Sequence, residues 1–283
     1  MKTLLRTGFA LVAFAMNSVL CRLALGQSAI DAASFSTIRL SSGAVALLLI
    51  TLVVKRGIVS GTTRGSWASA ALLFVYAVAF SLAYINLTAG TGALILFGSV
   101  QATMILAALV SGERPRLLEW LGLALALAGL IYLVLPGLKA PPLSSSALMA
   151  VAGVAWGFYS LRGRGVKEPL ALTTGNFVRA VPLAVAVSLV MLNGLHASSK
   201  GVLFAVLSGA LASGVGYVIW YSALRGLTAT RAATVQLAVP LLAAVGGVAL
   251  LAEEITLRLL LAAIMILGGV GIALASRSFS VKD

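Results

Sequence analysis

Residues 87–113 read LTAGTGALILFGSVQATMILAALVSGE, and residues 227–253 read LTATRAATVQLAVPLLAAVGGVALLAE. Each copy opens on Leu-Thr-Ala and ends on a glutamate. Directly before the glutamate lie 21 uncharged residues, Gly92 to Gly112 in one copy and Ala232 to Ala252 in the other. A helix of about 20 apolar residues crosses ~30 Å of hydrocarbon. The stretch therefore predicts a turn, a membrane-length helix and a terminal carboxylate, repeated at an offset of 140 residues.

The duplication extends beyond this stretch at the same offset. It relates further pairs of identical residues: Ala15 and Ala155, Arg22 and Arg162, Arg39 and Arg179, Ala83 and Ala223, and Gly129 and Gly269. We therefore divide the chain into residues 1–137 and residues 143–283, on either side of a linker that contains Pro136, Gly137, Pro141 and Pro142. Each half holds five apolar segments. Because five is odd, the halves enter the membrane from opposite sides, as the inverted repeats of transporters do.

The composition excludes a soluble domain. Hydrophobic residues make up 61% of the chain and charged residues 10%, whereas soluble domains are nearer half apolar and a quarter charged. The apolar runs lack the alternation of outer-membrane barrel strands. We expect an all-α polytopic protein in a lipid bilayer, with ten transmembrane helices as two inverted five-helix repeats. They are predicted over residues 4–23, 33–54, 66–86, 92–112, 117–135, 145–161, 173–195, 201–224, 232–252 and 257–276.

The distribution of lysine and arginine predicts the orientation. Fourteen of them fall on the side of both termini, and four, Arg22, Lys139, Lys200 and Arg258, fall on the other. Cytoplasmic loops carry the excess of positive charge, so both termini are predicted to be cytoplasmic. The net charge of +13 is explained by these loops, and we expect no nucleic-acid partner. Cleavage of a lipoprotein signal before Cys21 would need a small residue at position 20, where the sequence has Leu20. The first segment is therefore interpreted as a retained helix.

Several classes of site are excluded by residue counts. Cys21 is the only cysteine and His196 the only histidine. An HExxH zinc site needs two histidines. An intramembrane serine protease needs a Ser–His pair within the membrane, but His196 falls in a predicted loop. We therefore expect no enzyme activity, no metal and no cofactor. A channel is less favoured than a carrier, because no ring of charge or filter-like segment is visible.

The sequence resembles the drug/metabolite transporter superfamily in its EamA branch. The residues that carry the resemblance are Trp156-Gly157, Arg162, Arg39, Arg179, residues 223–229 and the segment from Pro240 to Glu253. The sequence departs from the pattern at two places. Met16-Asn17 stands where the family has Trp-Gly, and Val100 stands where the second half has Pro240. The resemblance implies a bacterial inner-membrane exporter of amino acids, drugs or other metabolites, with the aromatic amino-acid exporters of that branch as one candidate.

The acidic residues favour one transport mechanism over another. All seven, Asp31, Glu113, Glu119, Glu168, Glu253, Glu254 and Asp283, lie at predicted helix ends, in loops or at the terminus. Proton-driven antiporters place a carboxylate near the midplane, where burial raises its pKa. We therefore expect alternating-access export of small metabolites, amino acids above all, without a membrane-embedded carboxylate. Drug or cation antiport and the export of other metabolites, including nucleotide sugars, are the alternatives, and a monomer would suffice.

Five residues are predicted to act in gating or in structure. Glu113 and Glu253 end equivalent helices at opposite faces, where a carboxylate opposes the helix dipole and needs a partner. Arg39 and Arg179 lie some six residues inside their helices, where an arginine is costly without a partner. They could also bind a substrate carboxylate. Pro240 is predicted to kink its helix and act as a hinge.

The substrate-binding candidates are polar and aromatic residues nearer the middle of the predicted helices. Stacking surfaces with hydroxyl and amide groups suit an amphipathic, aromatic solute. The alternative is that tyrosine and tryptophan form belts at the membrane interfaces. The candidates are Asn17, Tyr76, Phe80, Tyr84, Ser99, Trp156, Tyr159, Tyr217, Trp220 and Gln236.

Overall fold

The computed structural model describes residues 2–54, 65–112, 116–134 and 141–275. Within these ranges the regular secondary structure is helical, and the one β-type contact is an isolated antiparallel bridge between Ile30 and Ala197. Eight of the described helices or helical runs are long and apolar enough to cross a membrane. Two shorter apolar stretches, Leu117–Gly129 and Leu257–Gly269, lie within the predicted fifth and tenth helices. The prediction of an all-α polytopic membrane protein is confirmed.

The observed helices follow the predicted order, with shifts of a few residues at their ends. Those of the first half are α1 (Lys2–Gly26), α2 (Ala32–Val54), α3 (Trp67–Tyr84), α4 (Ala89–Val110) and α5 (Leu117–Val134). Those of the second half are α6 (Leu143–Gly163), α7 (Pro169–Val190), the short η1 (Leu192–Gly194), α8 (Ser199–Leu207), η2 (Ser208–Val215), α9 (Gly216–Leu224), α10 (Ala229–Gln236), α11 (Val239–Leu251) and α12 (Leu257–Ala275).

The repeated Leu-Thr-Ala turn has the same local structure in both halves. The Thr88 hydroxyl accepts the Thr91 N–H at 3.3 Å and caps α4, and the Thr228 hydroxyl accepts the Arg231 N–H at 3.2 Å and caps α10. A threonine oxygen satisfies one of the N–H groups that a helix start leaves unpaired. The sequence repeat is thus explained at its start by matched helix caps.

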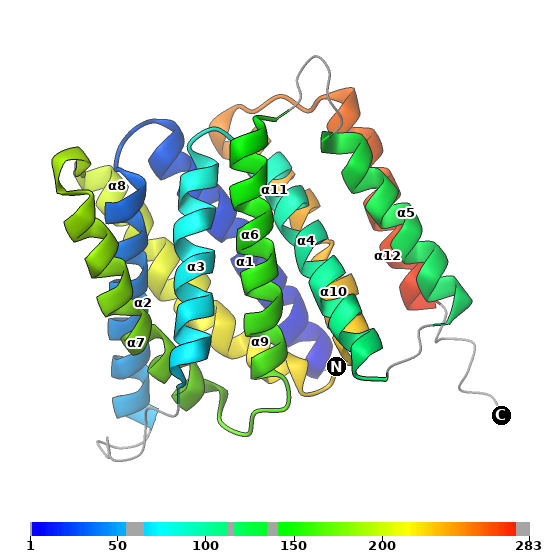
Figure 1. Ribbon diagram of the computed structural model, residues 1–283, viewed down its shortest axis with the longest axis horizontal. Helices are drawn as coiled ribbons and strands as arrows, with labels where there is room; N and C mark the ends of the chain where they lie inside the picture. Colours follow the sequence, from blue (N-terminus) through cyan, green and yellow to red (C-terminus); the bar gives the residue numbers. More distant parts are fainter. Residues whose placement is uncertain (1, 55–64, 113–115, 135–140, 276–283) are drawn as a thin grey trace.

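The main helix contacts have counterparts between the equivalent helices of the two halves. α3 packs on α6, and its counterpart, the α8–η2–α9 run, packs on α1. In the same way α4 packs on α6 and α11 packs on α1, while α2 pairs with α7 and α5 with α12. In Figure 1, α1 begins at the lower edge and α6 at the upper edge, so related helices run in opposite directions. The division at residues 1–137 and 143–283 stays a prediction.

Two of the predicted helices are not continuous α-helices. The predicted helix at residues 201–224 contains a π-helical segment, η2, between α8 and α9. The predicted helix at residues 232–252 breaks between Gln236, where α10 ends, and Val239, where α11 begins. Pro240 occupies the first turn of α11 and has no N–H to donate to the carbonyl four residues earlier. The predicted interruption is present, just before Pro240.

Candidate functional site

A buried cluster of aromatic and polar side chains lies where the two halves meet. It is built around Tyr76 of α3, Trp156 of α6 and Tyr217 of α9. The ring centroid of Trp156 lies 5.0 Å from that of Tyr76 and 4.5 Å from that of Tyr217. The Tyr217 hydroxyl donates to the Tyr76 hydroxyl at 3.3 Å. With Asn17 of α1 and Arg39 of α2, these residues form what we term the central cluster.

Arg39 supplies the charge of the central cluster. Its side chain is almost fully buried, at 1% exposed. Nε donates to the Ser213 hydroxyl at 3.0 Å, and Nη2 donates to the hydroxyls of Tyr76 and Tyr217 at 3.1 and 2.8 Å. The Nη1 atom has no hydrogen-bond partner among the described residues. The guanidinium carbon lies 5.1 and 4.9 Å from the ring centroids of Tyr76 and Phe80. All of these partners are neutral.

The π-helical segment η2 brings two serines to the cluster. Ser208 donates to the Asn17 carbonyl oxygen, and the Asn17 amide donates to the Tyr76 hydroxyl at 3.1 Å. Ser213, five residues later on η2, accepts from Arg39. A π-helix spaces residues i and i+5 along one side, and such segments often occur at functional sites. The unusual winding thus places both hydroxyls toward the same network.

A second polar contact joins the cluster to the break in the ninth predicted helix. The Trp156 indole N–H donates to the Gln236 side-chain oxygen at 2.9 Å. Gln236 is the last residue of α10, immediately before the break, and its amide donates to the Ala232 carbonyl at 2.9 Å. Movement of α10 against α11 would therefore change the position of Trp156.

The remaining aromatic candidates and Phe14, which was not among the candidates, surround the cluster. The Phe14 ring contacts Trp156, Tyr217 and Trp220, at centroid distances of 5.2, 5.9 and 5.5 Å. Between ring centroids, Tyr159 is 5.6 Å from Trp156, Phe80 is 5.3 Å from Tyr76, and Tyr84 is 4.7 Å from Phe80. All of them are buried, away from the lipid-facing surface where an interfacial belt would place them.

Two of the residues predicted from the sequence, Ser99 and Arg179, form hydrogen bonds within their own helices. Ser99 donates to the Ile95 carbonyl of its own helix at 2.9 Å and packs against α6 at Gly153. Arg179 donates to the Gly175 carbonyl of its own helix at 2.9 Å. Arg39 and Arg179 occupy equivalent positions in the repeat, yet the guanidinium of Arg39 reaches the centre and that of Arg179 does not.

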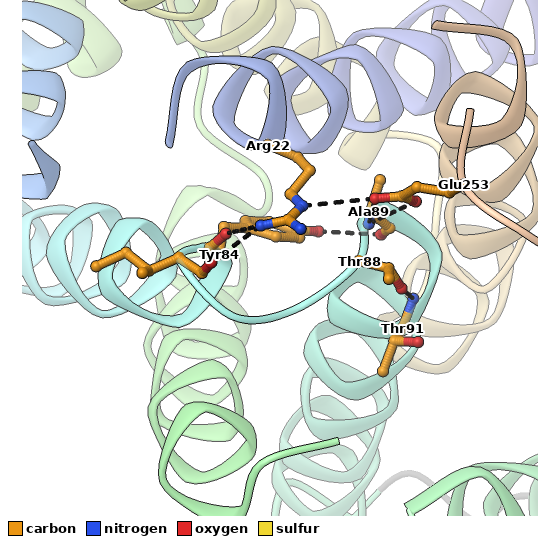
Figure 2. A network of polar contacts seen from close by, with 7 residues as sticks. Arg22, Tyr84, Thr88, Ala89, Thr91 and Glu253 are labelled. Atoms are coloured by element: carbon orange, nitrogen blue, oxygen red, sulfur yellow. Dashed lines mark hydrogen bonds and ion pairs between the residues drawn. The ribbon is translucent and has the colours of Figure 1, made fainter. Parts of the chain in front are cut away.

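At one face of the molecule, Arg22 and Glu253 join the ends of four helices (Figure 2). Arg22 Nε lies 3.5 Å from Glu253 Oε1, and Arg22 Nη1 donates to the carbonyls of Tyr84 and Ile85 at 3.1 and 2.9 Å. Both Glu253 oxygens accept the Ala89 N–H, at 3.1 and 3.0 Å. The cation thus meets the C-terminus of α3 and the anion the N-terminus of α4, as their helix dipoles favour. We term this contact the Arg22–Glu253 latch.

On the same face, Asp31 ties the α1–α2 connection to the segment before α8. Its carboxylate accepts the Ser34 N–H at 2.8 Å and the His196 N–H at 2.9 Å. The Asp31 N–H donates to the His196 carbonyl at 3.0 Å. Partial burial raises the pKa of the Asp31 carboxyl, but the hydrogen bonds from Ser34 and His196 outweigh it, so the pKa lies below its ordinary value.

The opposite face has different contacts at the equivalent positions. Arg162, the counterpart of Arg22, donates to the hydroxyls of Ser69 and Ser66 at 3.0 and 3.4 Å. Ala229, the counterpart of Ala89, lines a pocket of about 180 Å³ together with Ser111 and Arg164. Glu113, the counterpart of Glu253, lies outside the described residues. At the described equivalent positions the contacts of the two faces therefore differ, although the sequence repeats.

Sequence reasoning did not single out Arg22, Phe14, Ser208 or Ser213 as site residues. Arg22 matches Arg162 in the repeat and stands among only four cations on its predicted side, which was a usable signal. Ser208 and Ser213 are five residues apart, a spacing that neither an α-helix nor a strand places on one side. Phe14 carried no signal that distinguishes it from ordinary packing.

The comparisons with known proteins agree with this architecture. The sequence profile described as "EamA-like transporter family" matches residues 143–275. A Pseudomonas aeruginosa protein, described as "Uncharacterized protein PA1977", is 52% identical over 276 residues, which cover 98% of this chain and 96% of that protein. A solved crystal structure superimposes with a TM-score of 0.70 at 20% identity, over 96% of this chain and 99% of the other. At that identity it shows the fold alone.

More distant relatives carry transporter names. The Escherichia coli K12 protein described as "Uncharacterized inner membrane transporter YedA" is 29% identical over 118 residues, covering 42% of this chain and 37% of that protein. An "Uncharacterized transporter" of Archaeoglobus fulgidus is 26% identical over 209 residues, covering 72% of this chain and 74% of that protein.

Proposed function

The chain belongs to the EamA-like transporter family, and we propose that it exports small amphipathic metabolites, amino acids above all, across the bacterial inner membrane by alternating access. The inner-membrane location follows the description of YedA as an inner membrane transporter. The excess of lysine and arginine on one side supports cytoplasmic termini. The Arg22–Glu253 latch then faces away from the cytoplasm.

The observation that carries the proposal is the central cluster. It draws Asn17, Arg39 and Tyr76 from the first half and Trp156 and Tyr217 from the second, and all five are buried. In transporters built from inverted repeats, the substrate site lies where the repeats meet and the halves move around it. Ring faces, hydroxyls and one guanidinium provide for a solute with an apolar body and a polar end.

The difference between the two faces supports alternating access. The latch holds α1, α3, α4 and α11 together on one face, whereas on the other face the counterpart of Arg22 has serine partners. If the halves exchange their local states, the latch opens as its counterpart closes. Gating roles for Arg22, Glu253 and Glu113 belong to this proposal.

The positions of the acidic residues support transport without a membrane-embedded carboxylate. Glu253 serves the latch, Asp31 precedes α2 directly, and Glu119 lies in the first turn of α5. The central cluster is built from neutral groups and one cation. Proton-coupled exchange of cationic drugs, which uses a carboxylate near the midplane, is the alternative.

The decisive experiment is counterflow in proteoliposomes that contain the full chain. Amino acids, sugars and organic cations would be compared as internal solutes, with and without a pH gradient. We expect saturable exchange of amino acids that does not depend on the gradient. Gradient-dependent uptake of organic cations would support drug antiport instead, and non-saturable flux would indicate a channel.

A further inference from the structure

We propose that Arg39 binds a carboxylate of the transported solute, and that this carboxylate is required for recognition whereas an amino group is not. The inference rests on the proposed carrier function and deepens it, because it names the chemical group that the central cluster recognises. It concerns Arg39 alone and does not extend to its repeat counterpart, Arg179.

The first step is the charge balance of the cluster. A guanidinium stays protonated in proteins, and the Arg39 side chain is 1% exposed. Its hydrogen-bond partners are the hydroxyls of Ser213, Tyr76 and Tyr217. A buried ion is costly unless it is paired with an opposite charge. The cluster therefore carries one positive charge that its described residues do not neutralise, and an anionic solute would neutralise it.

The second step is the geometry of the guanidinium. Nε and Nη2 have hydroxyl partners, whereas Nη1 has no hydrogen-bond partner among the described residues although it is buried. A carboxylate accepts two parallel N–H groups from an arginine, and such charged hydrogen bonds are roughly twice as strong as neutral ones. A carboxylate at Nη1 and Nη2 would take over from the tyrosine hydroxyls. Those hydroxyls could then turn and donate to the same carboxylate.

The third step is the surroundings of the guanidinium. The ring centroids of Phe80 and Tyr76 lie 4.9 and 5.1 Å from its carbon, and the ring centroid of Trp156 lies 5.0 Å from that of Tyr76. These rings provide contact area for an apolar or aromatic body next to the carboxylate. The cluster contains a fixed cation and no carboxylate side chain of its own, so it disfavours amines and gives an ammonium group no required partner.

The test compares three solutes that share a phenyl ring and the two carbons attached to it: 3-phenylpropionate has only the carboxylate, phenethylamine has only the amine, and phenylalanine has both. Binding to the full chain in detergent would be followed by tryptophan fluorescence and by the shift in melting temperature. We expect 3-phenylpropionate and phenylalanine to bind and phenethylamine to have no effect. These wild-type measurements require no variant to fold.

The matched variants are Arg39→Lys and Arg179→Lys. Lysine keeps the positive charge but loses the fork that binds a carboxylate through two N–H groups. We expect Arg39→Lys to weaken 3-phenylpropionate binding at least tenfold. Arg179 donates to its own helix, so Arg179→Lys should bind as the wild type does.

Several results would overturn the inference. They are binding of phenethylamine as tight as that of 3-phenylpropionate, binding of phenylalanine but not of 3-phenylpropionate, and wild-type affinity in Arg39→Lys. Equal protection by the same concentration of sodium chloride would show that any anion is sufficient and that a carboxylate is not required. No effect of any carboxylate would also overturn it. Counterflow of any solute that persists in Arg39→Lys would leave the carrier function standing, whereas 3-phenylpropionate binding without counterflow of any solute would reject the carrier function itself.

Discussion

Arg22 and Glu253 lie 231 positions apart in the numbering, yet the Arg22 Nε atom is 3.5 Å from the Glu253 carboxylate. The contact joins the end of α1 in one half to the second residue after α11 in the other (Figure 2). Each side chain also binds the backbone of the first half, at the end of α3 and the start of α4. In the proposed transport cycle, these contacts would have to break when this face opens.

Glu253→Gln is expected to open the latch face and expose Cys21. Glutamine removes the charge that pairs with Arg22, and hydrogen bonds to charged groups contribute about 1.5–3 kcal/mol. Cys21, the only cysteine, is fully buried next to Arg22 in the sequence. We expect roughly a tenfold faster reaction of Cys21 with a membrane-impermeant maleimide, the factor that about 1.4 kcal/mol gives. Glu254→Gln is the control, since it removes a neighbouring charge outside the latch. Equal labelling of both variants would contradict the gating role.

Pro240→Ala is expected to slow transport without preventing expression. Alanine would supply the N–H that the break before α11 lacks and would favour one continuous helix through Gln236. Because Gln236 binds Trp156, a stiffer helix should restrict movement of the cluster. Counterflow rates measured with the best solute of the panel should fall several-fold at similar expression. A rate equal to that of the wild type would remove the hinge from the mechanism.

Gly209→Ala is expected to destabilise the protein. A Cβ at this position would lie 2.1 Å from both the Arg39 carbonyl oxygen and the Ser42 hydroxyl, so α2 and η2 would have to separate. Overpacking of this kind costs about 1–3 kcal/mol. Gly8→Ala is the matched control, because a Cβ there meets no atom within 4 Å. Thermal unfolding in detergent should show a lower melting temperature for Gly209→Ala only, and equal melting temperatures would show that the helices are not held this closely.

Asp31→Ser is expected to remove a pH-dependent part of the stability while keeping a helix cap. The folded-state pKa of Asp31 is lowered. Its contribution is therefore present above the unfolded pKa of ~3.9 and is lost as the pH falls through the folded-state pKa. Serine caps a helix but does not titrate in this range. The wild type should melt higher than Asp31→Ser at pH 7, and the difference should shrink below about pH 4. A difference that is constant with pH would show that the charge contributes nothing.

The parts of the fold that depend on local chemistry could be predicted from the sequence. Thr88 and Thr228 cap equivalent helices because the same turn sequence occurs in both halves, and the apolar runs between charged residues mark the helices. Tyr76, Trp156 and Tyr217 were predicted to line a site, and the structure brings them together. Their mid-helix position and polar tips drew attention to them, and that they bind a solute stays a prediction.

The parts that depend on tertiary contacts could not. The winding of η2 places Ser208 and Ser213 opposite Asn17 and Arg39, and no local propensity of these residues favours a π-helix. Arg39 and Arg179 look alike in the repeat, but among the described residues Arg39 has hydroxyl partners from other helices, whereas Arg179 donates to a carbonyl of its own helix. Helix packing therefore decided which of the two arginines joined the cluster.

The partners of Arg39 also have a consequence for the way the chain is made. Arg39 is 37 residues from Tyr76 but 174 residues from Ser213 and 178 from Tyr217. At about 5–20 residues per second, a ribosome needs on the order of 10–35 seconds to synthesise the chain between Arg39 and these last two partners. During that interval α2 carries a cation into the bilayer with part of its hydrogen-bonding network still unsynthesised. The first half of the protein thus depends, for the partners of its buried arginine, on helices that are synthesised later.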